Sequence, residues 1–482
     1  MGYRIQPREI DVPEGDPFEN DLLGREEPAN TLSNLVASIE GPCVISVDSS
    51  WGTGKTTFLR LWAQLLRNQG FSVVEFNAWE TDFSGDPFVA LSTEVTESLS
   101  SFENETIKNT IEQTKELAKE VVRASVPGAV RLLTSGVVDV QSVVEKKDEM
   151  ADYRKARQAR NKFRESLQEM AGALAAANEQ RPLVVVIDEL DRCRPSYAVE
   201  LLEAAKHLFA GDGIVFVLAL NRSELAHSVR TLYGVDFDAI GYLRRFIDVD
   251  FRLPDPDRTE FIDDALDAVR ISDYFERTVD RNAKVDREEE VSREWLKRYF
   301  GSPDFSLRRI AKAIHHLGLV FATLPSDRRS YAITAVVALT LRTANPELYH
   351  QFWRGEASDL DVVDQVFKEN PGLSACRQEH AGRMFEALII LAAVEIAGTN
   401  EESINTELVR RYRKAVDDEG ADPTAKKHAS AVISILERLA DRAVEGYGTV
   451  GQRFGFKETV RRLELLSPSL IAETSEADFR HP

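Results

Sequence analysis

The stretch VISVDSSWGTGKTTFLRL, residues 44–61, joins a short apolar run, a loop containing glycine and a segment with helical spacing. The apolar run ends at Asp48, and apolar residues recur after the loop at the spacing of one helix face. A strand, a loop ending in Gly54-Lys55-Thr56 and a helix form the context of a phosphate-binding loop. In that context backbone N–H groups of the loop and of the helix start point at phosphates. The stretch therefore predicts a nucleotide site.

The loop departs from the usual pattern at its first position, where Ser49 replaces a glycine. The exchange matters only if residue 49 needs a positive φ, and it would then cost about 1–2 kcal/mol. Gly52 and Gly54 remain, so the backbone can still approach a phosphate. We expect Lys55 to reach the β- and γ-phosphates of ATP and the Thr56 hydroxyl to ligate Mg²⁺. The loop residues expected to bind the nucleotide are Ser50, Trp51, Gly52, Thr53, Gly54, Lys55, Thr56 and Thr57.

A second motif, VVVIDELDR, covers residues 184–192 and places acids directly after four apolar residues. In P-loop folds such a strand is expected beside the loop strand, where Asp188 helps to hold Mg²⁺. Glu189 is then placed to polarise the attacking water, with Asp191 as a rival for that role. The alternative is that both later acids only cap the next helix and that Asp191 pairs with Arg192.

Further polar and basic side chains could complete the site. Asn221 ends another strand, where it could orient the water or only cap the helix that follows. The pairs Arg244-Arg245 and Arg308-Arg309 could each bring one cation to the transferring phosphate, or remain solvated. An arginine in that position can raise the rate by a factor of about 10³–10⁵. We take Arg245 and Arg308 as the candidates.

Strands alternate with helices from about 40 to 250, and the strands read as continuous Val- and Ile-rich runs. Such runs predict an α/β fold in which helices sandwich a parallel sheet. After a break at residues 251–257 the pattern is helical almost to the end. The predicted domains are a P-loop core at 1–255 with a helical insert at about 84–180, a helical lid at 256–325, an all-α domain at 326–465 and a disordered tail at 466–482.

The composition limits which partners and which cellular compartment we expect. The net charge is −20, so nucleic acid is not an expected partner. The six basic residues within 154–164 read as a solvated face, or else as a patch that contacts phosphates. Three cysteines far apart make neither a disulfide framework nor a metal cluster, which fits a reducing cytoplasm. We see no secretory leader and no apolar run of the about 20 residues that span a membrane.

The ordered motifs resemble the KAP family of P-loop NTPases over residues of about 21 to 320. The blocks that carry the resemblance are DLLGREEPANTLSNLVASI, WGTGKTT, FNAWETDFSGDPFVAL, VVVIDELDRCRP, FVLALNRSELAHSVRTLYG, YLRRFIDVDFRLP and SLRRIAKAIHHL. The resemblance implies a STAND/AAA+-like division of the fold, with the acidic strand beside the loop strand. The C-terminal third matches no family that we can name.

The resemblance also implies roles for single residues. Leu23, Gly24 and Arg25 would lie near the nucleotide base or the phosphates. Asn77 and Trp79 would support the loop from the neighbouring strand, although Trp79 could equally be core packing. The lid arginine, read as a sensor of the γ-phosphate, falls on the position already named, 308.

Many relatives carry membrane helices between the loop and the acidic strand. The equivalent segment here, residues 121–144, contains Arg123, Arg131 and Asp139. Each charge would be costly at the centre of a bilayer. We therefore expect a core hairpin or a surface helix and no membrane partner.

Three functions remain open. The first is a Mg²⁺-dependent ATPase that acts as a switch or in assembly, which the resemblance places in bacterial anti-phage defence. The second is a nucleotide-binding scaffold with little turnover that recruits a protein, and Ser49 favours it. The third is a DNA-stimulated motor, against which the net charge of −20 argues. ATP is preferred and no motif excludes GTP. A protein partner is expected, and the sequence leaves a homo-oligomer open.

Overall fold

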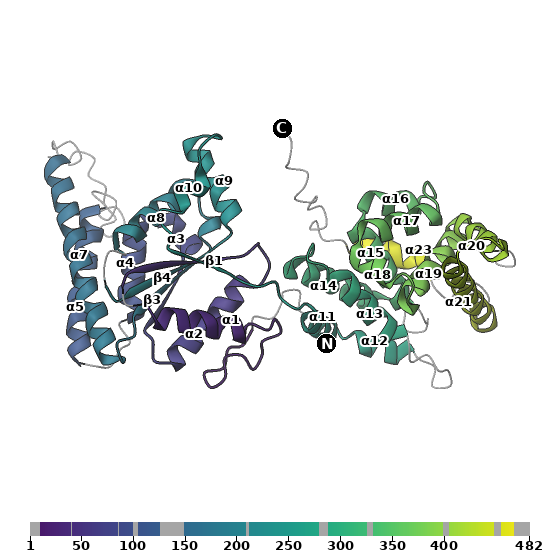
Figure 1. The fold of residues 1–482 in the computed structure, drawn as a ribbon, viewed down its shortest axis with the longest axis horizontal. Helices are drawn as coiled ribbons and strands as arrows, with labels where there is room; N and C mark the ends of the chain where they lie inside the picture. Colours follow the sequence, from purple (N-terminus) through teal and green to yellow (C-terminus); the bar gives the residue numbers. More distant parts are fainter. Residues whose placement is uncertain are drawn as a thin grey trace, which may run out of the picture. The chain divides into compact units, whose positions relative to one another are not determined.

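The computed structural model describes residues 10–39, 41–84, 86–99, 105–125, 149–208, 212–278, 288–324, 331–398, 404–447 and 455–466. The chain divides into two compact units, and it passes from one to the other between Pro256 and Asp257. We call Glu9–Pro256 the sheet unit and Asp257–Pro482 the helical unit, and each is described by itself (Figure 1).

The sheet unit is built on five parallel strands in the order β2-β3-β4-β1-β5. The strands are β1 (Cys43–Asp48), β2 (Val73–Asn77), β3 (Leu183–Asp188), β4 (Ile214–Leu220) and β5 (Val249–Arg252). The Val- and Ile-rich runs of β1, β3 and β4 are buried along nearly their whole length. Such burial on both faces confirms the parallel sheet covered by helices.

The order of the strands corrects one expectation. The acidic strand β3 does not lie beside the loop strand β1, because β4 pairs with both of them. All seven residues of β4 are apolar and buried, which favours a central place in the sheet. The ends of β1 and β3 are therefore separated by two strand spacings, about 10 Å.

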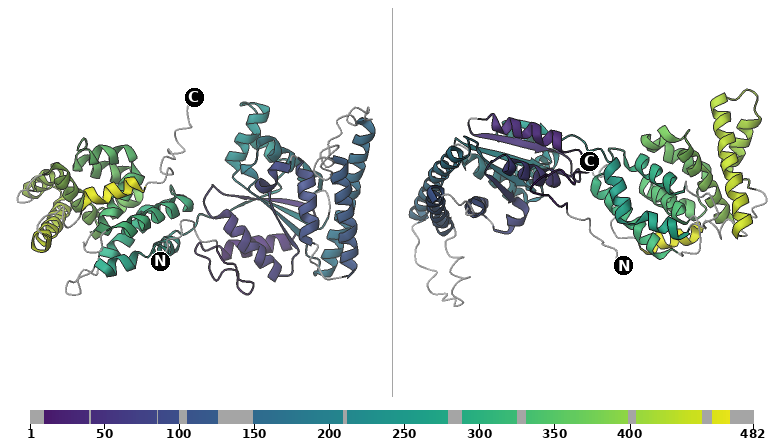
Figure 2. Two further views of the ribbon diagram at one scale, coloured as in Figure 1. Left: turned by 180° about the vertical axis from the view of Figure 1, so that it is seen from behind. Right: turned by 90° about the horizontal axis from the view of Figure 1, so that it is seen from below.

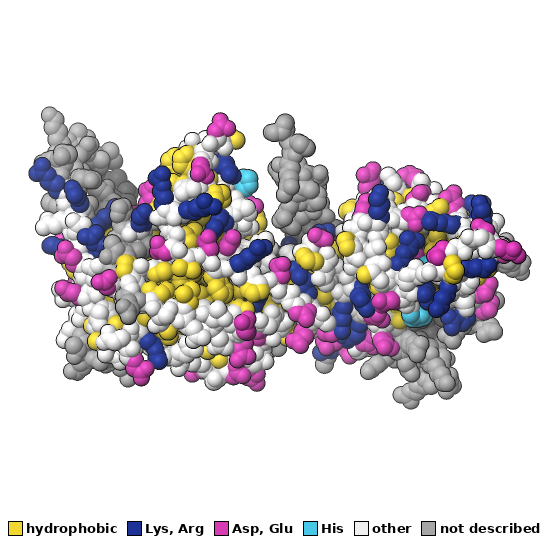
Figure 3. Space-filling model, in the orientation of Figure 1, with side chains coloured by type: hydrophobic (Ala, Val, Ile, Leu, Met, Phe, Trp, Pro, Cys, Tyr) yellow, Lys and Arg dark blue, Asp and Glu magenta, His cyan; other side chains and the backbone are white. Residues whose placement is uncertain are grey.

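Helices cover both faces of the sheet (Figures 1 and 2). One face carries α1 (Glu26–Ala37) and α2 (Lys55–Asn68), whose apolar side chains share a core with β1 and β4. The helices on the other face are α4 (Pro87–Ser98), α5 (Glu105–Ser125), α7 (Glu149–Ala177), α8 (Pro195–Leu208), α9 (Arg222–Tyr233) and α10 (Ala239–Leu243). In the view of Figure 3, hydrophobic side chains also gather in a band over the strands of this unit.

The insert between β2 and β3 is helical, and α5 packs along α7 (Figure 1). Phe163 of α7 meets Phe88 of α4 edge-on, with ring centroids 5.9 Å apart, and belongs to the core of the sheet. Arg160 pairs with Asp86 at 3.1 Å, which fits a solvated face better than a patch for phosphates. Residues 126–148 lie outside the described residues, so the hairpin or surface helix expected at 121–144 is not tested. Across the described ranges, no helix has the length and apolar content needed to cross a membrane.

The helical unit contains only helices in its described residues. They are α11 (Thr259–Ala268), α12 (Ile271–Thr278), α13 (Glu288–Phe300), α14 (Leu307–Thr323), α15 (Tyr331–Ala344), α16 (Pro346–Trp353), α17 (Asp359–Glu369), α18 (Pro371–Cys376), α19 (His380–Ala397), α20 (Glu407–Asp417), α21 (Pro423–Tyr447) and α23 (Phe456–Leu465). The segments expected as lid and C-terminal domain pack against each other here: Trp295 stacks on Phe385 with ring centroids 4.3 Å apart. The tail from 467 on lies outside the described residues.

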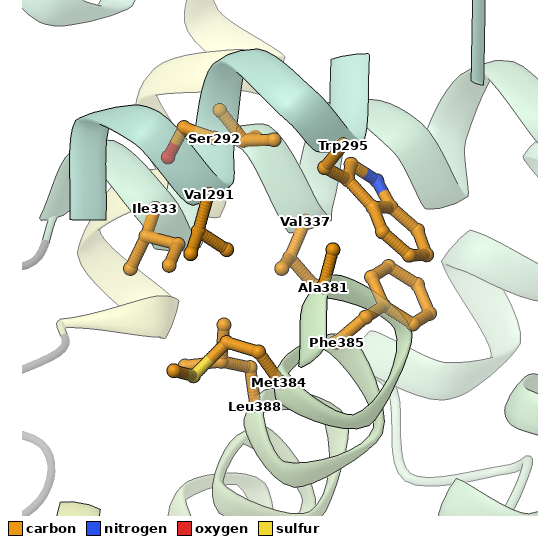
Figure 4. A pocket seen from close by; sticks show the side chains of 10 residues that line it. Val291, Ser292, Trp295, Ile333, Val337, Ala381, Met384, Phe385 and Leu388 are labelled. Carbon is orange, nitrogen blue, oxygen red and sulfur yellow. The ribbon is translucent and has the colours of Figure 1, made fainter. Parts of the chain in front are cut away.

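A small apolar gap remains between α13, α15 and α19 (Figure 4). Its lining is Val291, Ser292, Trp295, Ile333, Val336, Val337, Ala381, Met384, Phe385 and Leu388. The lining includes no charged side chain, so the gap offers nothing to bind a phosphate.

Candidate nucleotide-binding site

The loop that follows β1 carries its two sharp turns on glycines. Gly52 has a φ of 73° and Gly54 a φ of 86°, the left-handed region that glycine adopts at little cost. In the described part of the chain, the non-glycine residues with a positive φ are Glu179, Gln180, Glu189 and Arg270. Ser49 is not among them, so its replacement of glycine brings no backbone strain.

Side chains fix this loop from within. The hydroxyls of Ser49 and Thr53 share a hydrogen bond, and Thr53 Oγ1 also donates to the carbonyl of Ser50 at 2.9 Å. The backbone N–H of Ser49 donates to the carbonyl of Leu220 at the end of β4, at 3.2 Å. The loop is therefore held in shape by hydroxyls where the usual pattern has glycine.

Arg25 holds the loop from outside. Its guanidinium donates to the carbonyl of Thr53 at 2.8 Å and to the carbonyl of Pro254 at 2.6 Å, and only 1% of the residue is exposed. Gly24, with a φ of 64°, makes the turn before it. The resemblance placed these residues near the nucleotide, and the structure brings Arg25 to the backbone of the loop.

Lys55 is the first residue of α2 and is almost buried. Its Nζ lies 3.3 Å from the carbonyl oxygen of Ser49 and 3.7 Å from Oδ2 of Asp191. Burial lowers the pKa of Lys55, while the carboxylates of Asp191, Asp188 and Asp48 act in the opposite direction. A phosphate that entered the loop would meet a cation already held over it.

Two oxygen ligands suited to Mg²⁺ lie together beside the loop. The hydroxyl of Thr56 lies close enough to the carboxylate of Asp188 to lower its pKa, and the same carboxylate accepts the N–H of Glu189 at 2.8 Å. Burial raises the pKa of Asp188. No group of three metal-ligating side chains occurs within the described ranges, and Mg²⁺ that binds with a nucleotide needs only one or two carboxylates. The pair therefore fits this cation.

Glu189 is held by two neighbours. Its Oε1 lies 2.5 Å from a guanidinium nitrogen of Arg192, and the side chain of Asn77 at the end of β2 lies close enough to lower its pKa. Its φ of 60° is left-handed, which costs a non-glycine residue about 1–2 kcal/mol. Burial raises the pKa of Glu189. The pairing of Arg192 with Asp191 that the sequence left open is therefore wrong, since Arg192 pairs with the residue one helical turn before it.

Asp191 joins three parts of the site. Its Oδ2 accepts the indole N–H of Trp51 at 2.7 Å and the backbone N–H of Asn221 at 2.9 Å, and faces Lys55. The side chain is only 2% exposed. Asp191 thus ties the tip of the loop to the end of β4, a function that neither alternative from the sequence included.

Asn221 lies at the end of β4, between the loop strand and the acidic strand. Its Oδ1 accepts the backbone N–H of Ser223 at 3.2 Å and the hydroxyl of the same residue at 2.6 Å. It therefore caps α9, and a further role in orienting water stays a prediction.

Arg245, one of the two candidate cations, does not lie at the loop of its own chain. Arg245 precedes β5, and its carbonyl accepts Nζ of Lys206 at 3.0 Å near the end of α8. Three residues further on, Asp248 accepts the N–H of Val44 at the start of β1, at 2.9 Å. Arg245 thus lies at the edge where the strands begin, opposite the loop of its own chain. Arg308 belongs to α14 in the helical unit, so its part in the site stays a prediction.

Two features near the site were not foreseen. Trp79 of α3 (Ala78–Thr81) is 55% exposed, so it is not core packing. Arg222, directly after Asn221, forms two hydrogen bonds with Asp250 of β5.

The ion pair between Glu189 and Arg192 could have been predicted from their spacing of three residues, because residues three apart face each other on a helical turn.

A family model for the KAP family P-loop domain matches residues 25–321, more than half of the 482 residues. A search of curated proteins finds no match. Similar solved structures include the ORC2 protein of Aeropyrum pernix with ADPNP and ADP, at 15% identity over 88% of this chain and 89% of that chain, with a TM-score of 0.24. Another is Cdc6p of Pyrobaculum aerophilum, at 14% identity over 95% of each chain, with a TM-score of 0.30. Likenesses this weak carry no argument. On the family match, together with the loop and the sheet that carries it, the chain belongs to the KAP family of P-loop NTPases.

Proposed function

We propose that the protein binds ATP together with Mg²⁺, hydrolyses it and uses the change of nucleotide state as a switch. The observation that supports this best is the meeting of three groups at one edge of the sheet. They are Lys55 over the loop, the pair formed by Thr56 and Asp188, and Glu189 directly after it. Nucleotide binding alone would need the first two, and the third is the group that turnover needs.

Each group has a distinct part. Lys55 and the N–H groups at the start of α2 would bind the β- and γ-phosphates. Thr56 and Asp188 would hold Mg²⁺, which supplies positive charge at the phosphates when bound. Glu189 would accept a hydrogen bond from the attacking water and take its proton. Burial raises the pKa of Glu189, which makes its carboxylate a better base.

A nucleotide-binding scaffold with little turnover is the second candidate. One observation favours it: the carboxylate of Glu189 is paired with the guanidinium of Arg192 at 2.5 Å. A carboxylate held in this way is not free to take a proton from water. Bound nucleotide would then only stabilise the fold that recruits a protein. The strain at Ser49 that the sequence raised in favour of this candidate is absent.

We further propose that the helical unit passes the nucleotide state to a protein partner. Bacterial anti-phage defence is the setting that the resemblance to KAP relatives suggests. ATP is the expected nucleotide, and competition with GTP in the same assay decides between them.

The test is Mg²⁺-dependent phosphate release by the full chain, beside Lys55→Ala and Glu189→Gln. We expect turnover to be lost in both, with ATP still bound by Glu189→Gln. Glu200→Gln, on the exposed face of α8, is the matched control and should behave as the wild type. Wild-type turnover no higher than that of the variants, with ATP bound, would replace the ATPase by the scaffold.

A further inference from the structure

Arg192 is the cation nearest to the residue proposed as the base. It ends the short helix η4 (Leu190–Arg192), and its guanidinium lies 2.5 Å from Oε1 of Glu189. About a third of its side chain is exposed, whereas the side chain of Glu189 is mostly buried. The arginine can therefore change its partner more easily than the glutamate can.

The backbone of Arg192 also lies at the loop. Asp191, the residue directly before it, has Oδ2 3.7 Å from Nζ of Lys55 and accepts the indole N–H of Trp51 at the tip of the loop. A long arginine side chain that starts beside these contacts can turn from Glu189 towards a phosphate held by the loop. Lys55 is the residue that the loop pattern assigns to the β- and γ-phosphates.

We infer that Arg192 exchanges Glu189 for the terminal phosphate when ATP binds, so that one movement reads the γ-phosphate and releases the base. The inference rests on the proposed function. A guanidinium binds phosphate oxygens through two parallel N–H donors, and a triphosphate carries more negative charge than one carboxylate. After the exchange Oε1 of Glu189, which Arg192 occupies before it, can accept a hydrogen bond from water.

The same exchange makes Arg192 a discriminator between nucleotides. ADP has no γ-phosphate, so the arginine would stay on Glu189 and the base would remain blocked. Arg192 is thus a positioning residue for the base as well as a contact for the third phosphate. From the sequence these cations were predicted at positions 245 and 308, and Arg192 was predicted only as a partner of Asp191.

The experiment measures binding of a non-hydrolysable ATP analogue and of ADP, each with Mg²⁺, by calorimetry on the full chain. We expect Arg192→Gln to lower the affinity for the analogue by about 10- to 100-fold, which corresponds to the loss of a hydrogen bond to a charged group. The affinity for ADP should change by less than about twofold. Arg192→Lys keeps the charge and should recover part of the loss. Arg67→Gln, which breaks an exposed ion pair with Glu75, is the matched control.

A double-mutant cycle separates exchange from simple contact. In Glu189→Gln the arginine has no charged partner to leave, so the analogue should bind more tightly than to the wild type. That gain should vanish when Arg192→Gln is added. Equal losses for analogue and ADP, or a gain from Glu189→Gln that survives in the double variant, would overturn the inference. Because both readouts are binding, absent turnover in the wild type would contradict the proposed ATPase without deciding the role of Arg192.

Discussion

Ser49 replaces the first glycine of the loop pattern without straining the backbone of the loop. Its φ is not left-handed, and its hydroxyl bonds to Thr53 across the loop. Ser49→Gly should therefore bring no relief of strain. We expect it to lower the free energy of unfolding by about 0.5–1 kcal/mol, because glycine has more freedom in the unfolded chain. Chemical denaturation measures this, with Ser49→Ala to isolate the hydroxyl, and tighter ATP binding by the glycine variant would contradict it.

The ionised carboxylate of Asp188 should lower the free energy of unfolding at neutral pH when no nucleotide is bound. Burial raises its pKa above the usual 3.8, although the Thr56 hydroxyl opposes this. The folded state then keeps a proton that the unfolded state has already lost, so stability falls as pH rises from the usual pKa through the raised one. Asp188→Asn removes the charge. We expect the melting temperature of this variant, measured without nucleotide, to exceed that of the wild type near neutral pH. In acid the difference should be smaller. A difference independent of pH would refute this.

Asp191 is the residue whose loss should damage the loop most. Asp191→Ala leaves the N–H groups of Trp51 and Asn221 without their acceptor, at a cost of about 1–3 kcal/mol for each buried group. Asp191→Asn keeps an oxygen at that place and should cost less. Unfolding free energies of the two variants check the order. Equal stability of both would show that charge, rather than the hydrogen bonds, ties the loop to β4.

At the scale of elements, the sequence was enough for the kind of structure but not for its order. Alternating strands and helices, with runs buried on both faces, predicted the parallel sandwich. That β4 lies between β1 and β3 depends on packing between distant parts of the chain, which local patterns do not encode. The loop and the acidic motif were each found from the residues. The partners of Asp191 were not, because Trp51, Lys55 and Asn221 lie far from it in the chain. For Arg192 the spacing from Glu189 offered a signal that the prediction did not use.

Arg25 connects three elements of the sheet unit, and its substitution tests whether it binds the nucleotide or only supports the loop. It joins the segment before α1, the loop and the end of the sheet unit through the carbonyls of Thr53 and Pro254. Arg25→Met keeps the apolar stem but leaves both carbonyls without their donor. We expect a loss of about 2–3 kcal/mol in the free energy of unfolding, with nucleotide affinity in the folded protein nearly kept. A large loss of affinity with little loss of stability would instead favour direct contact with the nucleotide.

For the whole molecule, the role predicted for Arg245 at a phosphate would require a second copy of the chain. It lies at the opposite edge of the sheet from the loop of its own chain, so it could serve only the loop of another. We expect Arg245→Ala to lose activity by up to about 10³-fold. A mixture of Arg245→Ala with Lys55→Ala should regain part of it, because one intact site can form between them. Phosphate release of the mixture and of each variant alone is the measurement, with Arg244→Ala as the comparison.

A mixture no more active than its components would contradict that arrangement. So would a specific activity that stays constant across a range of protein concentrations. Either result would leave each chain to work with its own cations, and Arg192 would be the first of these to examine.

The indole of Trp51 is 41% exposed at the tip of the loop, and its N–H is bonded to a buried carboxylate. Trp62 and Trp295 are almost fully buried, whereas Trp79 is exposed as well. In a Trp79→Phe variant a quencher dissolved in water would therefore dim the emission of Trp51 and spare that of the two buried indoles. The loop therefore contains an intrinsic fluorescent probe. Arrival and departure of a ligand could be followed by light, in real time, on protein without any label.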